Sequence, residues 1–111
     1  MAQRRKDTLQ GSLDLLVLRT LRSGNALHGF AIAQRIQEVS RDVLRVEEGS
    51  LYPALHRMEE SGWLSSEWEA SDNNRRARYY RVTTRGRRHL GDLEEDWSRH
   101  VRAVGRVLRL A

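Results

Sequence analysis

The stretch VEEGSLYPALHRMEESGWL, residues 46–64, decides the fold because it joins a core-packing pattern to an unusual exposed end. At 100° per residue, Leu51, Leu55 and Met58 fall on one face of a helix, which is typical of a helix packed on a core. The opposite face and its flanks carry small, ring-bearing or hydrogen-bonding residues: Gly49, Ser50, Tyr52, Pro53, His56 and Arg57. We therefore expect a helix over residues 48–61 whose N-terminal half meets another molecule. Its proline is expected in or near the first turn, and Gly62 is expected to end it in a left-handed conformation.

Two further helices are expected before this stretch. Asp7 or Thr8 is suited to cap a helix that runs to about residue 22, where Ser-Gly-Asn ends it. The centre of that helix, residues 15–18, is apolar on nearly every side. Such a helix is normally buried all round, which a chain of 111 residues achieves more easily with a partner subunit. A second helix is expected over residues 29–39, where Phe30, Ala33 and Ile36 recur at helical spacing.

A hairpin and a long helix are expected after the stretch. Residues 63–69 and 78–83 have the composition of strands, and residues 70–74 supply turn residues between them. Thr83 or Thr84 is suited to cap a last helix that nearly reaches Ala111. The predicted fold is mainly α with a small β-hairpin, which makes a winged helix-turn-helix with a long C-terminal dimerisation helix. We divide it into a DNA-binding domain, residues 1–83, and the dimerisation helix, residues 84–111, which forms one compact unit with the N-terminal helix.

The positive charge is concentrated where the hairpin is expected. The net charge is +5, and Lys6 is the only lysine, so nearly all of the positive charge is arginine. Residues 73–88 hold seven arginines and no acidic residue, and Arg75, Arg76 and Arg78 fall at or just after the hairpin tip. A wing tip of this kind suits phosphates or a minor groove. The basic arm at residues 4–6 adds three charges and is expected to be disordered without DNA. The alternatives are a solvated charge run and an arginine bias of the genome.

A long apolar stripe is expected along the last helix. Its residues recur at steps of three or four: Leu90, Leu93, Trp97, Val101, Val104 and Leu108. A seam of this length needs a partner surface, and we expect a two-fold homodimer in which the first helix contributes Leu15 and Leu18. Trp97 is expected either to pack in this interface or to form one wall of a ligand pocket at the dimer centre. Packing of the stripe on its own domain is the alternative.

Other classes of protein find little support. The chain has no cysteine, no apolar run near the roughly 20 residues that a membrane span needs, and no signal peptide, so we expect a soluble cytoplasmic protein. There is no glycine-rich phosphate loop and no catalytic spacing among the four histidines, so we expect no enzyme, no cofactor and no metal. Asp96 and His100 are four residues apart. They form either a surface pair on one helix or, across a dimer axis, a metal site.

The chain resembles the PadR-type transcriptional regulators over nearly its whole length. The resemblance is carried by LQGSLDLLVLRTL, HGFAIAQRI, VEEGSLYPALHRMEESGWL and ARYYRVTTRGRRHL, in that order. The third piece is close to the family pattern of small-hydroxyl-Leu-Tyr-x-x-Leu-x-x-hydrophobic-Glu-x-x-Gly. The string SDNNRRARYY is similar to a subgroup common in acidobacterial genomes. The resemblance implies a winged-helix dimer that usually represses transcription, of the short class without a separate effector domain.

The resemblance also implies roles for single residues. Ser50, Tyr52, Pro53 and Arg57 match the DNA-reading helix, Gln34 matches the preceding helix, and Arg75, Arg76 and Arg78 match the wing. Trp97 matches a tryptophan that stacks on planar compounds in ligand-sensing members, with Leu15 and Val101 as neighbouring wall residues. The sequence departs from a drug-binding pattern where Asp14, Arg19 and His100 bring polarity near the seam. Phe30 stands where the family more often has tyrosine.

The expected function is therefore that of a sequence-specific regulator that binds double-stranded DNA. It is expected to be a dimeric repressor on a pseudo-palindromic operator, released by a small planar hydrophobic effector at the dimer interface. The alternative is a winged-helix protein-interaction module without specific DNA binding, which has no need of an arginine-rich wing. RNA binding is less well supported because stacking aromatics on an open sheet are missing.

Overall fold

The structure is a computed structural model that describes the backbone of residues 2–70 and 74–110, and the side chains of residues 12–70 and 74–109. The described elements follow one another as α1 Ala2–Leu21, β1 Leu27–His28, α2 Gly29–Val39, α3 Glu48–Glu60, β2 Leu64–Ala70, β3 Arg76–Val82 and α4 Thr84–Leu110. This is the predicted winged helix-turn-helix with a long C-terminal helix, so the fold class is confirmed. The predicted turn residues 71–73 lie outside the described part.

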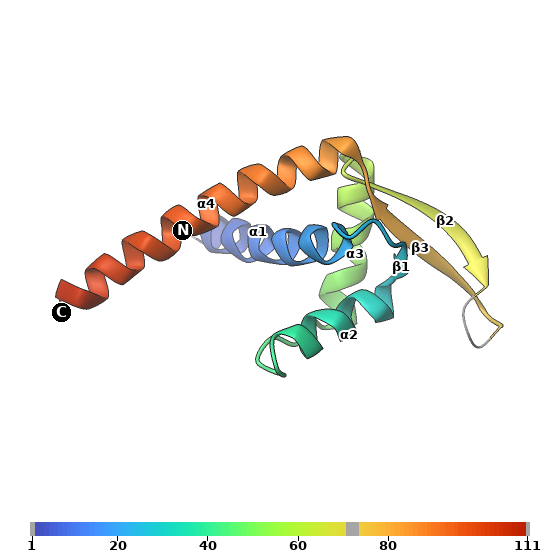
Figure 1. Ribbon diagram of the computed structural model, residues 1–111, viewed down its shortest axis with the longest axis horizontal. Coiled ribbons are helices and arrows are strands. Elements are labelled where there is room, and N and C mark those ends of the chain that lie inside the picture. Colours follow the sequence, from blue (N-terminus) through green and yellow to red (C-terminus); the bar gives the residue numbers. More distant parts are fainter. Residues whose placement is uncertain (1, 71–73, 111) are drawn as a thin grey trace.

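The core lies where α1, α2, α3, the first turns of α4 and the base of the sheet meet (Figure 1). The fully or almost fully buried hydrophobic residues are Val17, Leu18, Leu21, Ile32, Ile36, Leu51, Ala54, Leu55, Met58, Leu64, Tyr80 and Leu90. The α3 face predicted to be buried is therefore confirmed. The helix predicted over residues 29–39 is confirmed, and its buried stripe is centred on Ile32 and Ile36, while Phe30 is 59% exposed.

The sheet has three antiparallel strands in the order β1-β3-β2, one more than the predicted hairpin. The additional strand has only two residues, and Leu27 and His28 pair with Tyr80 and Tyr79. His28 then caps α2, because its Nδ1 accepts a hydrogen bond from the backbone N–H of Ala31 at 3.1 Å. A two-residue strand has no periodicity, so the sequence pattern offered no signal for it.

The ends of the helices show which local sequence signals were sufficient to predict where a helix begins or ends. Gly62 has φ +82°, and the N–H of Trp63 donates to the carbonyl of Met58, so the predicted left-handed end of α3 is confirmed. Thr83 caps α4 through its Oγ1, which accepts from the N–H of Gly86. Pro53, however, lies in the second turn of α3, because the helix begins at Glu48.

The first helix is longer than predicted. It begins at Ala2 instead of Asp7 or Thr8. The backbone of residues 4–6 is therefore helical, where a disordered arm was predicted. Arginine, lysine and glutamine are good helix formers, and neither proline nor glycine interrupts residues 2–10. The side chains of these residues lie outside the described part.

The molecule is elongated, 55 Å long and 29 by 28 Å across. Helix α4 runs beside α1 and then continues past the rest of the fold, while the wing formed by β2 and β3 points the other way (Figure 1). No helix among the described residues is long and apolar enough to cross a membrane.

Candidate nucleic-acid interface

Helix α3 presents an exposed face opposite its anchored one. Leu51, Leu55 and Met58 are completely buried and fix the rotation of the helix about its axis. That rotation leaves the predicted contact residues Gly49, Ser50, Tyr52, Pro53 and His56 exposed at the surface. Gln34 is exposed on α2. The structure brings Gln34, Tyr52 and His56 to one hollow, whereas Ser50 and Pro53 line a second hollow beside α1.

Tyr52 is held against the first residue of α2. A Cβ atom placed on Gly29 would lie 2.6 Å from Cε1 of Tyr52, so the ring occupies the space that any larger residue would fill. Gly29 is itself buried, whereas Tyr52 is 40% exposed. The glycine thus lets the tyrosine pack closely on α2 while part of its ring stays accessible.

Arg57 does not extend freely from α3. Its Nη1 and Nη2 donate to the two carboxylate oxygens of Asp14 at 3.0 and 2.6 Å. Asp14 is 5% exposed, and its hydrogen bonds are the main cause of the raised pKa of Arg57. The predicted DNA-reading arginine is therefore tied to α1, with about a third of its side chain accessible.

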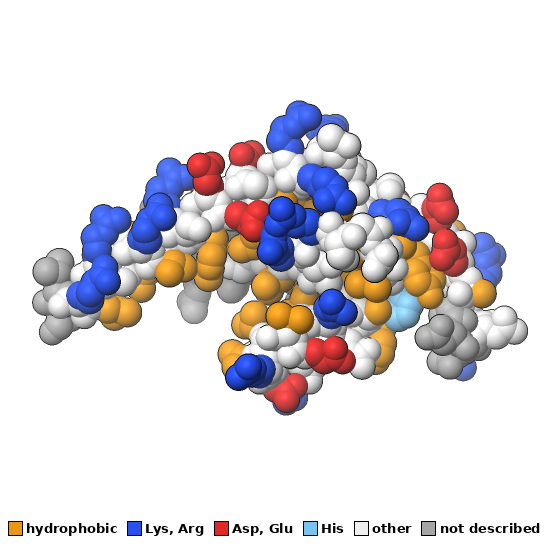
Figure 2. Space-filling model, viewed as in Figure 1, with side chains coloured by type: hydrophobic (Ala, Val, Ile, Leu, Met, Phe, Trp, Pro, Cys, Tyr) orange, Lys and Arg blue, Asp and Glu red, His pale blue; other side chains and the backbone are white. Residues whose placement is uncertain are grey.

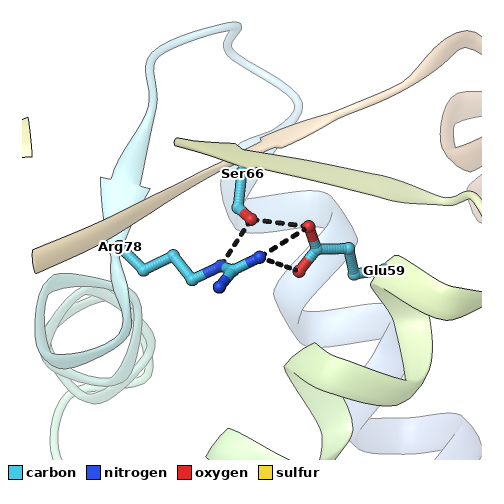
Figure 3. Close-up of polar contacts among 3 residues, drawn as sticks. All are labelled: Glu59, Ser66 and Arg78. Carbon is cyan, nitrogen blue, oxygen red and sulfur yellow. Dashed lines mark hydrogen bonds and ion pairs between the residues drawn. The ribbon is translucent and has the colours of Figure 1, made fainter. Parts of the chain in front are cut away.

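The three arginines predicted at the wing tip differ in their surroundings. Arg75 and Arg76 are exposed. Arg78 is engaged within the protein: its Nε donates to Ser66 Oγ at 2.6 Å, and its Nη2 donates to both Glu59 carboxylate oxygens at 3.2 and 3.4 Å (Figure 3). Ser66 Oγ in turn donates to Glu59 at 2.6 Å. This last hydrogen bond, followed by Arg78, holds the pKa of Glu59 below its usual value.

A hollow of about 870 Å³ separates α2 and α3 from the wing. It is lined by His28, Gly29, Phe30, Ala31, Gln34, Tyr52, His56, Trp68, Arg75, Arg76, Ala77, Arg78 and Tyr80. Among the residues that the structure describes, no carboxylate belongs to this lining. A basic, partly aromatic hollow beside the N-terminal half of a helix suits the sugar-phosphate backbone of a nucleic acid.

Several lining residues were not predicted as site residues, among them the exposed aromatic residues Phe30 and Trp68. Trp68 is 55% exposed on β2. The alternation of Leu64, Ser66 and Trp68 on one side of a strand was a signal that was open to sequence reasoning. The helical spacing of Phe30 gave no sign that its side chain lines the hollow.

The long apolar stripe of α4 continues beyond the core. Trp97, Val101, Val104 and Leu108 are between 42% and 69% exposed. Figure 2 shows hydrophobic side chains along one side of the projecting helix and basic ones along the other. Leu15 and Leu93 are partly buried, but Leu18 and Leu90 are enclosed within the chain's own core.

Polar residues near this stripe already have partners. Arg19 forms an ion pair with Glu94 at 3.5 Å, and Asp14 is bound to Arg57. Asp96 accepts a hydrogen bond from Arg99 at 2.8 Å, while the ring of His100 lies 5.8 Å from that of Trp97. In the described part of the chain, no group of three or more histidine or acidic residues is placed to hold a metal ion.

Comparisons with known proteins agree with the fold described above. The profile of the transcriptional regulator PadR-like family matches residues 17–92. The transcriptional regulator Rv3488 of Mycobacterium tuberculosis is 47% identical over 66 residues, which are 60% of this chain and 58% of that protein. A PadR family transcriptional regulator from Eggerthella lenta is similar in structure, with a TM-score of 0.76 and 30% identity over 96% of this chain and 90% of that one. A transcriptional regulator from Clostridium thermocellum has a TM-score of 0.80 over 90% of this chain and 96% of that one. At 24% identity it shows the fold alone.

Proposed function

The chain belongs to the transcriptional regulator PadR-like family, and on this premise we propose that it is a homodimeric repressor that recognises a pseudo-palindromic operator. Its family consists of DNA-binding transcriptional regulators, so the chain is a regulator and not an enzyme. Repression, the subunit arrangement and the effector are proposals.

The hollow between α3 and the wing is the observation that carries the DNA-binding mode. A recognition helix in the major groove with its wing at the neighbouring minor groove straddles one strand of the duplex. The hollow of about 870 Å³ lies at the corresponding place and has arginines on its wing side. The contacts that we propose come from Gln34, Gly49, Ser50, Tyr52, Pro53, His56, Arg75 and Arg76. Arg57 adds only the accessible part of its guanidinium, and Arg78 acts through the wing.

The exposed stripe of α4 supports the dimer. Four large apolar residues at steps of four, three and four residues form a seam that water covers in the single chain. We propose that Trp97, Val101, Val104 and Leu108, with the partly buried Leu15 and Leu93, pack on the same surface of a second copy. Residues 1–83 would then read DNA while residues 84–111 set the distance between two recognition helices. A two-fold dimer of this kind places them roughly 34 Å, or a multiple, apart.

The same seam is the proposed place of an effector. Trp97 is 45% exposed and Val101 is 49% exposed, and both lie on the stripe that a partner would cover. A planar hydrophobic compound between the two copies of Trp97, bordered by Leu15 and Val101, would alter the angle between the subunits. Changing that angle moves both wings, which would release the operator and let polymerase bind.

The experiment is a titration of the purified protein into two duplexes at two salt concentrations. One duplex carries the DNA upstream of the protein's own coding sequence, and the other carries the same bases in scrambled order. We expect tighter binding to the first, with two chains per site, and affinities that fall steeply with salt. Equal binding to both would contradict sequence-specific recognition. Absence of binding at low salt would favour a protein-interaction module.

A further inference from the structure

The two faces of the wing differ in charge. The register pairs Trp68 with Arg78 and Ala70 with Arg76, so these side chains share the face of the sheet that also carries buried Leu64 and Tyr80. The opposite face carries Glu67 and Glu69 beside Arg81. The wing strands line the hollow beside α3 with Trp68, Arg76, Arg78 and Tyr80 from the first face, and with Ala77 from the other. A polyanion is therefore attracted more strongly to the face that carries Trp68.

Trp68 is exposed and yet constrained. The guanidinium of Arg76 lies 5.5 Å from the centroid of its ring, and that of Arg78 lies 5.7 Å from it. Both distances are within the range of cation–π attraction. Its side chain is nevertheless 55% exposed, which is costly for so large an apolar surface unless a partner covers it.

Arg78 owes its position to α3. The hydrogen bonds with Glu59 and Ser66 hold its guanidinium beside the end of the helix (Figure 3). A carboxylate already neutralises its charge, so it is poorly suited to bind a phosphate. The same contacts join α3 to both strands of the wing, and they set the place of the indole relative to the recognition helix.

The wall opposite Trp68 is formed by side chains of α2 and α3. Phe30, Tyr52 and His56 line this side of the hollow, and none of them carries a negative charge. A DNA strand between a helix in the major groove and a wing at the minor groove offers two chemical surfaces. Its phosphates face the basic side chains, and its deoxyribose rings offer an apolar surface that suits an indole.

From this arrangement we propose that Trp68 is a DNA-contacting residue whose ring packs on a deoxyribose of the strand that crosses the hollow. Arg78 is the positioning residue that holds Trp68 and the wing at the required distance from α3. The inference rests on the DNA-binding function proposed above. Because every nucleotide has a deoxyribose, the contact adds affinity for any sequence and does not discriminate between operators.

The test is a salt series of DNA affinities for Trp68→Ala, Trp68→Phe and Arg75→Ala, with the upstream duplex and its scrambled counterpart. An apolar contact releases no counterions. We expect Trp68→Ala to lose about tenfold in affinity for both duplexes with an unchanged salt slope. Trp68→Phe should regain most of the loss. Arg75→Ala, the matched control, should reduce the slope by roughly one for each wing on the DNA.

Two results would overturn the assignment of Trp68: wild-type affinity in Trp68→Ala, or a slope that falls together with its affinity. A loss confined to the upstream duplex would show a base contact instead of a sugar contact. These outcomes can be distinguished even if the wild-type protein binds both duplexes equally. Equal binding would contradict only the proposed operator recognition and would leave the role of Trp68 to be tested. Light scattering should show the same subunit number for Trp68→Ala as for wild type, since a change would make the indole part of a protein interface.

The role of Arg78 is tested by a lysine. Lysine keeps the charge but lacks the fork that reaches both Glu59 and Ser66. If Arg78 positions the wing, Arg78→Lys should bind as weakly as Arg78→Ala, with a wild-type salt slope in both. If it binds phosphate, Arg78→Lys should keep the slope and most of the affinity, which would contradict the positioning role.

Discussion

Asp14 on α1 and Arg57 on α3 are joined by two hydrogen bonds, 2.6 and 3.0 Å long. The carboxylate is almost completely buried, whereas the guanidinium keeps about a third of its surface accessible. Since α1 also contacts α4, this pair connects the proposed recognition helix to the helices that we propose for the dimer.

Asp14→Asn should destabilise the fold, because the amide cannot accept both hydrogen bonds and leaves Arg57 without its counter-charge. We expect the free energy of unfolding to fall by about 2 kcal/mol, the usual contribution of hydrogen bonds to a charged group. Urea unfolding of both proteins measures it. Asp92→Asn removes an exposed carboxylate of α4 and serves as the control. Equal stability of wild type and Asp14→Asn would show that the ion pair does not contribute to the free energy of unfolding.

Glu59 should make stability depend on pH at the acidic end. Its folded pKa lies below its usual value of 4.5, chiefly because of the hydrogen bond from Ser66. Near and below pH 4.5 the unfolded chain therefore binds the proton more tightly than the folded one. The stabilisation is fully present above pH 4.5 and is lost as the pH falls through the folded pKa.

Thermal unfolding of wild type and Glu59→Gln at a series of pH values tests this linkage. The variant should melt at a lower temperature at pH 6, and the difference should shrink steadily below pH 4.5. Glu60→Gln, an exposed neighbour, should follow wild type throughout. A difference between wild type and Glu59→Gln that stays constant down to pH 3 would mean that the carboxylate charge is not what stabilises the wing.

Gly29→Ala should weaken DNA binding through Tyr52. The new Cβ would lie 2.6 Å from the tyrosine ring, so the ring has to move from its place on the hollow. We expect a roughly tenfold loss of affinity, the size of one lost contact of about 1.4 kcal/mol. Gly91→Ala on α4, where nothing lies within 4 Å of the new Cβ, is the control. In a Tyr52→Ala background the Gly29→Ala effect should vanish, and persistence of the full loss there would refute the explanation.

Val104→Asp should break the dimer without unfolding the chain. Val104 is 42% exposed on the described chain, so its own fold tolerates a polar side chain, whereas a dimer would bury two carboxylates. We expect the dissociation constant of the dimer, measured by sedimentation, to rise roughly 100-fold or more. Arg106→Asp changes the opposite side of the same helix and should leave the dimer intact. Dissociation by both variants would point to net charge instead of the seam.

The parts of the fold that the sequence predicted are those governed by local signals. The spacing of Leu51, Leu55 and Met58, the left-handed end at Gly62 and the cap at Thr83 each depend on a few neighbouring residues. The partners of Arg57 and Arg78 could not be predicted in this way, because Asp14 is 43 positions away from Arg57 and Glu59 is 19 positions away from Arg78. Both arginines looked free for DNA in the sequence, and the tertiary packing engages them. Trp68 shows the reverse case: its alternation with Leu64 and Ser66 was readable in the sequence, whereas the hollow that it lines is formed only when the wing packs beside α2 and α3.

The central claim is that two copies of the chain place two recognition helices on one operator. Hydroxyl-radical footprinting of the DNA upstream of the coding sequence tests it most directly, because it maps protected sugars on both strands. We expect two protected patches related by a dyad, with centres about 10 base pairs or a multiple apart. In the Val104→Asp variant both patches should disappear together at concentrations where the wild-type protein protects them. A single patch, or one that Val104→Asp leaves unchanged, would contradict a dimer that reads two half-sites.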